Sequence, residues 1–231
     1  MDMQTLITKR TEFVNIINEL NFKKGVEVGV AKGEFSEYLL KNSNLEVLYS
    51  IDAWSKDLEA MKAYRTTYSV NNVDEYYEDA KKRLTPFGNR SIMIKDISEN
   101  AVKQFEDESL DFIYLDASHL FSGFALDLIN WWKKLEWGGL FAGHDFIRKS
   151  TYQVTYAING FSLEHKQFYY LTTDDNGHHH ATPNPSWWLI KTKRDKATWV
   201  KEFPQYKIDI QKQAEELGKR LKMDIPYECN S

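Results

Sequence analysis

One stretch near the N-terminus restricts the fold of this chain more than any other. Residues 25–33 read Gly-Val-Glu-Val-Gly-Val-Ala-Lys-Gly, and residues 34–40 continue as Glu-Phe-Ser-Glu-Tyr-Leu-Leu. We interpret them as a short apolar strand, a tight turn carrying Gly29 and Gly33, and an amphipathic helix. Such a glycine turn lets a ligand approach bare backbone near the positive end of the helix dipole. The pattern predicts a nucleotide-type cofactor site, with Glu27 facing a cationic group of the ligand. The alternative is an ordinary βα turn.

Length and charge narrow the class of protein. A chain of 231 residues suits one large α/β domain. The net charge is −4 and no basic block occurs, which argues against nucleic acid as a partner. No apolar run approaches the roughly 20 residues of a membrane span, so we expect no membrane partner. The lone Cys229 and the lack of a signal-peptide pattern favour a cytoplasmic protein.

The rest of the chain alternates strands and helices. Helices are expected over 2–20, 34–41, 55–85, 124–135 and 151–166, and strands over 25–28, 45–51, 91–95, 110–115, 140–143, 168–171 and 186–190. Trp137-Gly-Gly139 is predicted to end the fourth helix in a glycine cap. We expect one domain, with a leading helix over 1–21, a core over 22–190 and a partly helical extension over 191–231, interrupted at Pro204.

An acidic residue follows or ends each of the first five strands. These residues are Glu27, Asp52, Asp96, Asp116 and, after His144, Asp145. Ligands of open α/β folds bind at the edge where the parallel strands end. Asp52 lies 25 residues after Glu27 and matches the carboxylate that takes the ribose hydroxyls in doubly wound nucleotide folds. Three of these acids have a second interpretation when taken alone: Asp52 caps the next turn, Asp116 caps the following helix, and Asp145 hydrogen-bonds the next loop.

Taken together, these residues resemble the class I S-adenosylmethionine-dependent methyltransferases. Residues 27–33 match the Glu-x-Gly-x-x-x-Gly turn of that family, and the resemblance extends over about residues 22–190. It implies a Rossmann-like methyltransferase fold: a single doubly wound, mostly parallel seven-stranded sheet, with its last strand antiparallel, flanked by helices. It also implies S-adenosyl-L-methionine as cofactor, bound by Glu27, Gly29, Val30, Gly33, Asp52, Ala53, Trp54, Asp96, Ile97 and Asp116.

Two further segments resemble a narrower subfamily, which includes metal-dependent sugar O-methyltransferases of macrolide pathways. They are Leu115-Asp-Ala-Ser-His119 and the glycine-rich run that ends on His144-Asp145-Phe. The resemblance implies a divalent cation, usually magnesium, held by Asp116, His144 and Asp145, with His119 as general base. His144 stands where metal-binding members carry glutamate, and imidazole suits a hard cation less well than carboxylate. A magnesium site of two carboxylates, a softer ion such as manganese or zinc, and no metal therefore all stay open.

These residue types suit the chemistry of methyl transfer to oxygen. A sugar hydroxyl is a poor nucleophile and must lose its proton as the new bond forms, and histidine, with a pKa of about 6.5, is suited to accept it. A chelated cation would lower the pKa of the acceptor hydroxyl and fix its direction. Neighbouring strands lie about 4.8 Å apart, so Asp116 and Asp145 at adjacent strand ends are able to share one ion.

The sequence is therefore interpreted as an S-adenosylmethionine-dependent O-methyltransferase acting on a sugar hydroxyl, such as that of a deoxysugar like rhamnose in a glycan or glycosylated metabolite. The alternatives are a catechol-like acceptor, an NAD-dependent oxidoreductase and a non-catalytic cofactor-binding module. A homo-oligomer and membership of a larger glycan-modifying protein are left open. Minor hypotheses place the residues 178–180 (His-His-His) at the substrate entrance, and Trp54, Phe121 or Tyr152 in stacking contacts with ligand; solvated loop or core positions are the alternatives.

Overall fold

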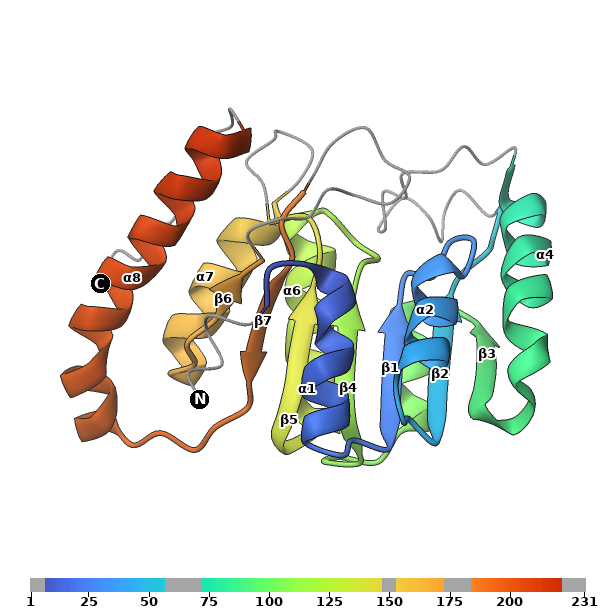
Figure 1. The fold of residues 1–231 in the computed structure, drawn as a ribbon, viewed down its shortest axis with the longest axis horizontal. Coiled ribbons are helices and arrows are strands. Elements are labelled where there is room, and N and C mark those ends of the chain that lie inside the picture. Colours follow the sequence, from blue (N-terminus) through green and yellow to red (C-terminus); the bar gives the residue numbers. More distant parts are fainter. Residues whose placement is uncertain (1–6, 57–71, 147–152, 173–183, 222–231) are drawn as a thin grey trace.

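The centre of the molecule is a seven-stranded sheet with the order β3-β2-β1-β4-β5-β7-β6 (Figure 1). The computed structural model describes residues 7–56, 72–146, 153–172 and 184–221. The strands are β1 (Lys24–Val28), β2 (Val47–Asp52), β3 (Ser91–Lys95), β4 (Leu110–Leu115), β5 (Leu135–Gly143), β6 (Tyr170–Leu171) and β7 (Trp187–Ile190). Strands β1 to β5 pair in parallel, and β7 runs antiparallel to both β5 and β6. The predicted sheet is confirmed.

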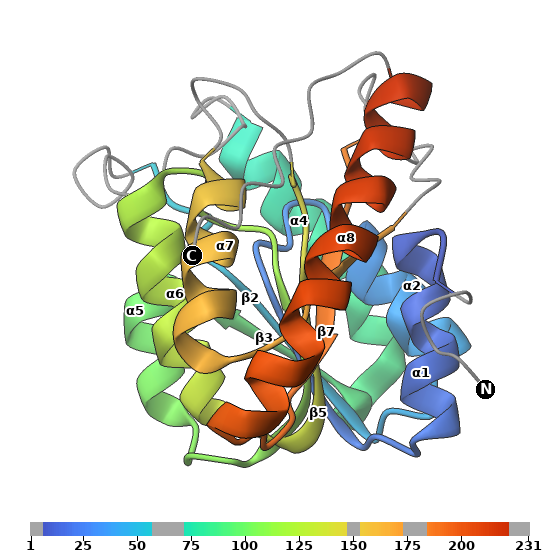
Figure 2. The same ribbon diagram turned by 90° about the vertical axis from the view of Figure 1, so that its left-hand side faces the viewer.

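Helices cover both faces of this sheet, as Figure 2 shows. The helices are α1 (Phe13–Glu19), α2 (Glu34–Asn42), α4 (Val73–Leu84), α5 (Ser98–Ala101), α6 (Phe121–Lys134), α7 (Val154–His165) and α8 (Lys196–Leu221). Helices α1, α2 and α4 pack on one face, and α5, α6, α7 and α8 contribute to the core on the other. Short 3₁₀ turns lie at Arg10–Glu12, Thr85–Arg90 and Val102–Gln104. No helix in the described part of the chain is both long enough and apolar enough to cross a membrane.

The alternation of side chains along β1 shows how the two faces are built. Val26 and Val28 lie in the core beneath α6, whereas Glu27 points to α2, where it contacts Ser36. β4 pairs with strands on both sides and is covered on both faces, so Phe112, Ile113 and Leu115 are all buried. The apolar runs in the sequence predict these central strands for that reason.

The strand order reverses between β1 and β4, and backbone hydrogen bonds align the strand ends there. Asp116 N donates to Val28 O over 2.7 Å, Asp96 N to Asp52 O over 3.1 Å, and His144 N to Leu115 O over 3.1 Å. The ends of β1 to β5 therefore form one continuous edge, which we call the carboxyl edge. Open α/β folds bind ligands at such a switch point.

The predicted glycine cap at Trp137-Gly-Gly139 is wrong. Helix α6 ends at Lys134, and Leu135 is already extended and begins β5. Gly138 N donates to Lys191 O over 2.8 Å and Lys191 N donates to Gly139 O over 2.9 Å, so pairing beside β7 draws these glycines into the sheet. The buried Lys191 ammonium instead donates to Trp132 O in the last turn of α6, over 2.9 Å, and to Leu135 O just after the helix, over 2.6 Å.

Three predicted helices differ in extent from the observed ones. Of the expected leading helix over 2–20, residues 2–6 lie outside the described residues, residues 7–9 are not helical, and α1 covers Phe13–Glu19. The expected interruption at Pro204 is wrong, because α8 continues through it. Buried Tyr206 and Ile210 anchor the helix beyond that point, and their packing outweighs the hydrogen bond that proline cannot donate. Of the expected helix over 55–85, residues 57–71 lie outside the described residues and Val73–Leu84 is confirmed.

Candidate active site

The glycine turn after β1 is shaped by contact with the end of β4. Gly29 has a φ of 94°, and a Cβ atom there would lie 2.1 Å from the Asp116 carbonyl oxygen. Only glycine fits such an approach. Gly33 has a φ of 78°, and its added Cβ would lie 3.1 Å from Ala80 Cα of α4. Because Gly29 has no side chain, the β1 turn lies close against the end of β4. Because Gly33 has none, α4 packs against the same turn.

The Asp52 carboxylate holds that turn from the end of β2. Its Oδ2 accepts the backbone N–H groups of Val30 and Ala31, both over 2.9 Å, and its Oδ1 accepts that of Trp54 over 3.0 Å. The indole N–H of Trp54 returns to Ala31 O over 2.8 Å. Asp52 is only 6% exposed. Its predicted contact with ribose stays a prediction, because in this structure the carboxylate serves the backbone of the turn.

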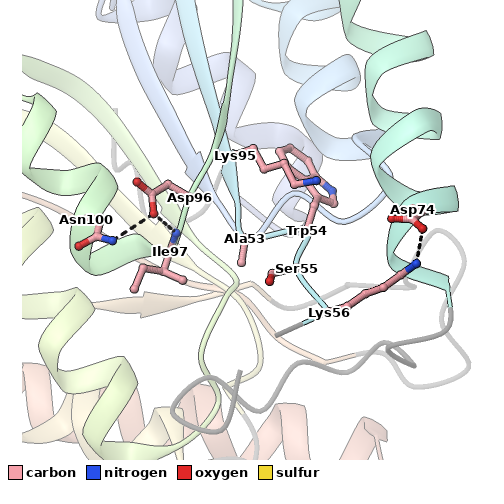
Figure 3. A pocket seen from close by; sticks show the side chains of 9 residues that line it. All are labelled: Ala53, Trp54, Ser55, Lys56, Asp74, Lys95, Asp96, Ile97 and Asn100. Carbon is pink, nitrogen blue, oxygen red and sulfur yellow. Dashed lines mark hydrogen bonds and ion pairs between the residues drawn. The ribbon is translucent and has the colours of Figure 1, made fainter. Parts of the chain in front are cut away.

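A pocket of about 560 Å³ lies beyond the ends of β2 and β3 (Figure 3). Ala53, Trp54, Asp96 and Ile97, all predicted cofactor residues, line it. Asp96 Oδ1 accepts hydrogen bonds from Ile97 N over 2.8 Å and from the Asn100 amide over 3.2 Å. Among the described residues nothing engages Asp96 Oδ2, so this oxygen is available to accept a hydrogen bond from an amino group. The β2–β3 pocket thus brings four predicted residues together.

Glu27 lies apart from this pocket, beneath α2. Its carboxyl is 2% exposed and accepts a hydrogen bond from the Ser36 hydroxyl, which in turn lies 2.7 Å from Ser50 Oγ. Burial raises the pKa of Glu27 to about 8, against the opposing effect of the Ser36 hydrogen bond. The structure therefore places Glu27 in a buried polar network, and contact with a cationic ligand group stays a prediction.

The predicted catalytic residues meet at the ends of β4 and β5. His119 Nε2 lies 2.7 Å from Asp145 Oδ2 and 3.8 Å from Asp116 Oδ1. His144 Nδ1 lies 3.3 Å from Asp145 Oδ1 and 3.9 Å from Asp116 Oδ1. Asp145 adopts a left-handed φ of 57°, a conformation that aspartate tolerates better than most residues. The two carboxylates and two imidazoles form one compact group, which we call the Asp–His cluster.

Charge balance within the Asp–His cluster shifts the pKa of its members. Burial alone would lower the pKa of His119, but the neighbouring carboxylates of Asp116 and Asp145 raise it to about 9. The pKa of His144 is raised against burial by the same two carboxylates. That of Asp145 is held well below its usual range by the two histidines, although burial opposes this. Positive charge on these imidazoles therefore balances the Asp145 carboxylate, which the fold keeps away from water.

The same cluster offers donors to a metal ion. One ligand atom from each of Asp116, His144 and Asp145 lies within 4.8 Å of the others. Two carboxylate oxygens and an imidazole nitrogen form a mixed donor set that suits manganese or zinc, and magnesium through its carboxylates. The residues present therefore fit the predicted divalent cation.

Two residues that the sequence did not single out complete the site. Arg10, in the 3₁₀ turn before α1, has its Nη1 3.8 Å from Asp116 Oδ2 and lies over the Phe35 ring, 5.2 Å from its centroid. The Asn184 amide, just before β7, donates to Asp145 Oδ1 over 2.5 Å and is 7% exposed. Neither belongs to a motif, and only the folded chain brings them to the Asp–His cluster.

The minor predictions of stacking and substrate-entrance residues have different outcomes. Phe121 is 48% exposed at the start of α6. Trp54 is buried and packs edge-on against Tyr77, with ring centroids 5.2 Å apart, while still lining the β2–β3 pocket. Tyr152 and the histidines at 178–180 lie outside the described residues.

Comparison with known proteins identifies what this arrangement resembles. A family model described as a methyltransferase domain matches residues 26–146, more than half of the chain. The O-methyltransferase from Bacillus cereus in complex with SAH has a TM-score of 0.56 at 12% identity, with 78% of this chain and 80% of that chain covered. The O-methyltransferase TomG from Streptomyces achromogenes, involved in Tomaymycin synthesis and in complex with SAM, has a TM-score of 0.56 at 10% identity, with 79% of each chain covered.

The structure of a putative rRNA-methylase from Clostridium thermocellum is similar to this chain to about the same degree. Its TM-score is 0.53 at 14% identity, and 78% of this chain and 95% of that chain are covered. No curated protein matches the sequence. At these identities the solved structures establish a common fold, while the family model establishes the family.

Proposed function

Because this chain belongs to the class I S-adenosylmethionine-dependent methyltransferases, we propose that it transfers a methyl group to a hydroxyl oxygen of a small molecule. One observation carries the proposal. The imidazole of His119, a group that can take a proton, lies 2.7 Å from Asp145 on the same carboxyl edge of the sheet as the β2–β3 pocket. The two similar proteins named as O-methyltransferases support an oxygen acceptor.

In the proposed reaction His119 accepts the hydroxyl proton at Nδ1 as the oxygen attacks, because its Nε2–H donates to Asp145 Oδ2. The donor, when bound, supplies a methyl group on a positively charged sulfonium. A lone pair of the oxygen forms the new C–O bond while the C–S bond breaks and its electron pair stays on sulfur, which leaves as a thioether. The oxygen keeps the O–H electron pair, so the proton must leave as the C–O bond forms. Asp145, 2.7 Å from Nε2, then stabilises the imidazolium, and the buried amide of Asn184 holds Asp145 in place.

A divalent cation is part of the proposal. Asp116, His144 and Asp145 would hold it, and when bound it would supply Lewis-acid activation of the acceptor hydroxyl. A cation neutralising these carboxylates also favours the neutral form of His119, which is the form that accepts a proton.

The proposed acceptor is a sugar hydroxyl, such as that of a deoxysugar in a glycan or glycosylated metabolite. Support comes from the resemblance of residues 115–119 and 138–146 to metal-dependent sugar O-methyltransferases. A catechol-like vicinal diol is the second candidate, because a cation shared by two carboxylates would chelate either diol. The rRNA-methylase likeness adds RNA as a comparison substrate, although the net charge of −4 disfavours it.

The decisive experiment measures methyl transfer from labelled S-adenosylmethionine to a panel of sugars, glycosides, catechols and RNA. We expect transfer to a sugar hydroxyl, with the position read by NMR of the product. Transfer to catechols alone would replace the sugar with the second candidate. Transfer only to nitrogen or carbon atoms would contradict the proposed reaction.

The metal is tested in the same assay with excess chelator. We expect activity to disappear and to return on addition of manganese or magnesium. Full activity in excess chelator would remove the cation from the proposal while leaving His119 as the base.

A further inference from the structure

Arg10 brings a fixed positive charge to the middle of the carboxyl edge. The residue comes from the turn before α1, its Nη1 lies 3.8 Å from Asp116 Oδ2, and its guanidinium lies over the Phe35 ring. Its positive charge acts electrostatically on both Glu27 and His144. The side chain is 20% exposed, so it is largely shielded but still accessible to a ligand.

The position of Arg10 follows from the order of the strands. The β2–β3 pocket lies at one end of the site and the Asp–His cluster at the other, over β4 and β5. Strand β1 lies between them, and neighbouring strands are about 4.8 Å apart. A ligand that fills the pocket and presents a reactive atom to His119 must therefore pass over Gly29 and Asp116, beside Arg10.

We propose that Arg10 and Asp116 together bind the amino-acid arm of the methyl donor. Arg10 takes its carboxylate and Asp116 faces its ammonium group. This inference rests on the proposed function. An α-amino acid carries one positive and one negative group on a single carbon, and Arg10 and Asp116 present the complementary charges side by side, 3.8 Å apart. The planar guanidinium matches a carboxylate with two parallel hydrogen bonds, and the Phe35 ring supports its plane.

Arg10 is suited to bind a carboxylate, and either the methyl donor or the acceptor could supply one. Two ligands distinguish the carboxylate of the donor from that of an acceptor. S-Adenosylhomocysteine has the amino-acid arm, whereas 5′-methylthioadenosine has the same adenosine and sulfur without it. Calorimetric binding of both ligands therefore reads the amino-acid arm directly, without any catalytic turnover.

The test compares Arg10→Met and Arg10→Lys with Lys41→Met, a control that removes a positive charge from the exposed end of α2, where Lys41 pairs with Glu37. Arg10→Met should weaken S-adenosylhomocysteine by about tenfold or more, the loss of one charge-assisted pair. Binding of 5′-methylthioadenosine should stay within about twofold, and Arg10→Lys should recover part of the loss. Lys41→Met should change neither affinity.

Several outcomes would overturn the proposal. Equal weakening of both ligands would mean that Arg10 supports the fold, and unchanged S-adenosylhomocysteine binding with a raised KM for an acidic acceptor would assign Arg10 to the acceptor. In an Asp116→Asn background, Arg10→Met must still weaken S-adenosylhomocysteine; no further loss would mean that Arg10 acts only through Asp116. If the unaltered protein bound neither ligand, the proposed function itself would fail, a result distinct from all of these.

Discussion

The carboxyl of Glu27 is protonated in the folded protein at neutral pH, because burial beneath α2 raises its pKa to about 8. In the unfolded chain the same carboxyl ionises near its ordinary value of 4.5. The folded state therefore binds this proton more tightly. The stability that Glu27 contributes is complete below about pH 4.5 and is lost as the pH rises through about 8.

We expect Glu27→Gln to flatten the decline of stability between about pH 5 and pH 8, because glutamine is polar but has no proton to lose. Urea unfolding at several pH values measures this. Asp127, whose pKa burial raises to about 7, acts in the same direction, so the slope should shrink rather than vanish. Glu78→Gln, at an exposed position of α4, is the control. Parallel pH profiles for Glu27→Gln and the unaltered protein would contradict the assignment.

A second prediction concerns the proposed base. His119→Ala should lower kcat by roughly 10²–10⁴-fold, the usual contribution of a general base, while S-adenosylhomocysteine affinity stays nearly unchanged. His165→Ala removes an imidazole at the far end of α7, which packs at a tilt against Phe161, and should leave kcat within a few-fold of the starting value. A normal kcat in His119→Ala would require another base.

Sequence reasoning finds residues that follow strand ends and misses those that reach the site from elsewhere. Asp116, His119 and Asp145 were predicted to meet, and they do, because parallel strands end at one edge. Arg10 and Asn184 touch the same carboxylates, but no spacing rule relates an N-terminal turn or the residue before β7 to β4 and β5. The pKa of Glu27 is likewise unreadable in the sequence, because it depends on burial under α2.

At the scale of elements, the close contact of the β1 turn with the end of β4 makes Gly29 irreplaceable. Gly29→Ala would force a methyl group to within 2.1 Å of the Asp116 carbonyl at a φ of 94°. We expect the variant to lose several kcal/mol of unfolding free energy, which is comparable to the total stability of a typical domain. It should also lose S-adenosylhomocysteine binding. Denaturant unfolding and calorimetry measure the two effects.

Gly160→Ala is the matched control for this prediction. Gly160 lies within α7, and a Cβ atom there meets nothing within 4 Å. Alanine should therefore stabilise the helix by up to about 1 kcal/mol. Comparable losses in both variants would show that the steric contact at Gly29 is not the cause.

Helices and strands follow the sequence prediction where the local sequence pattern and the tertiary contacts agree, and depart from it where the two conflict. Apolar runs bounded by turns predict the central strands correctly. Trp137-Gly-Gly139 carries a helix-stop signal, but pairing on both sides of β5 determined its conformation, and Lys191 replaced the glycine cap. Pro204 carries a helix-break signal that the buried face of α8 overrides. Tertiary contacts between distant segments decided both cases.

At the scale of the whole molecule, α8 closes an edge of the sheet. The side-chain amide of Gln213 accepts from Leu171 N over 3.1 Å and donates to Leu171 O over 3.0 Å. It thereby satisfies β6 on the side away from β7, as another strand would. An unprotected edge strand is a template for self-association.

We expect Gln213→Ala to lower the unfolding free energy by about 1–2 kcal/mol and to increase self-association. Gln211→Ala is the control, because Gln211 bonds only to the exposed Glu215 among the described residues of α8. Denaturant unfolding and light scattering measure the two quantities. A strictly monomeric, unchanged Gln213→Ala would mean that packing of Tyr206 and Ile210 alone seals the edge.

The reversal of strand order at β1 and β4 has a consequence for how such a molecule can change over evolutionary time. The β2–β3 pocket is built by one side of the sheet, and the Asp–His cluster by the other, with Gly29 and Asp116 touching at the seam. Mutations beyond β4, β5 and β7 would therefore change the proposed acceptor side of the site and leave the proposed nucleoside pocket between β2 and β3 unaltered. Engineering of a new acceptor should accordingly randomise residues near the ends of β4, β5 and β7 and leave those near the ends of β2 and β3 unchanged.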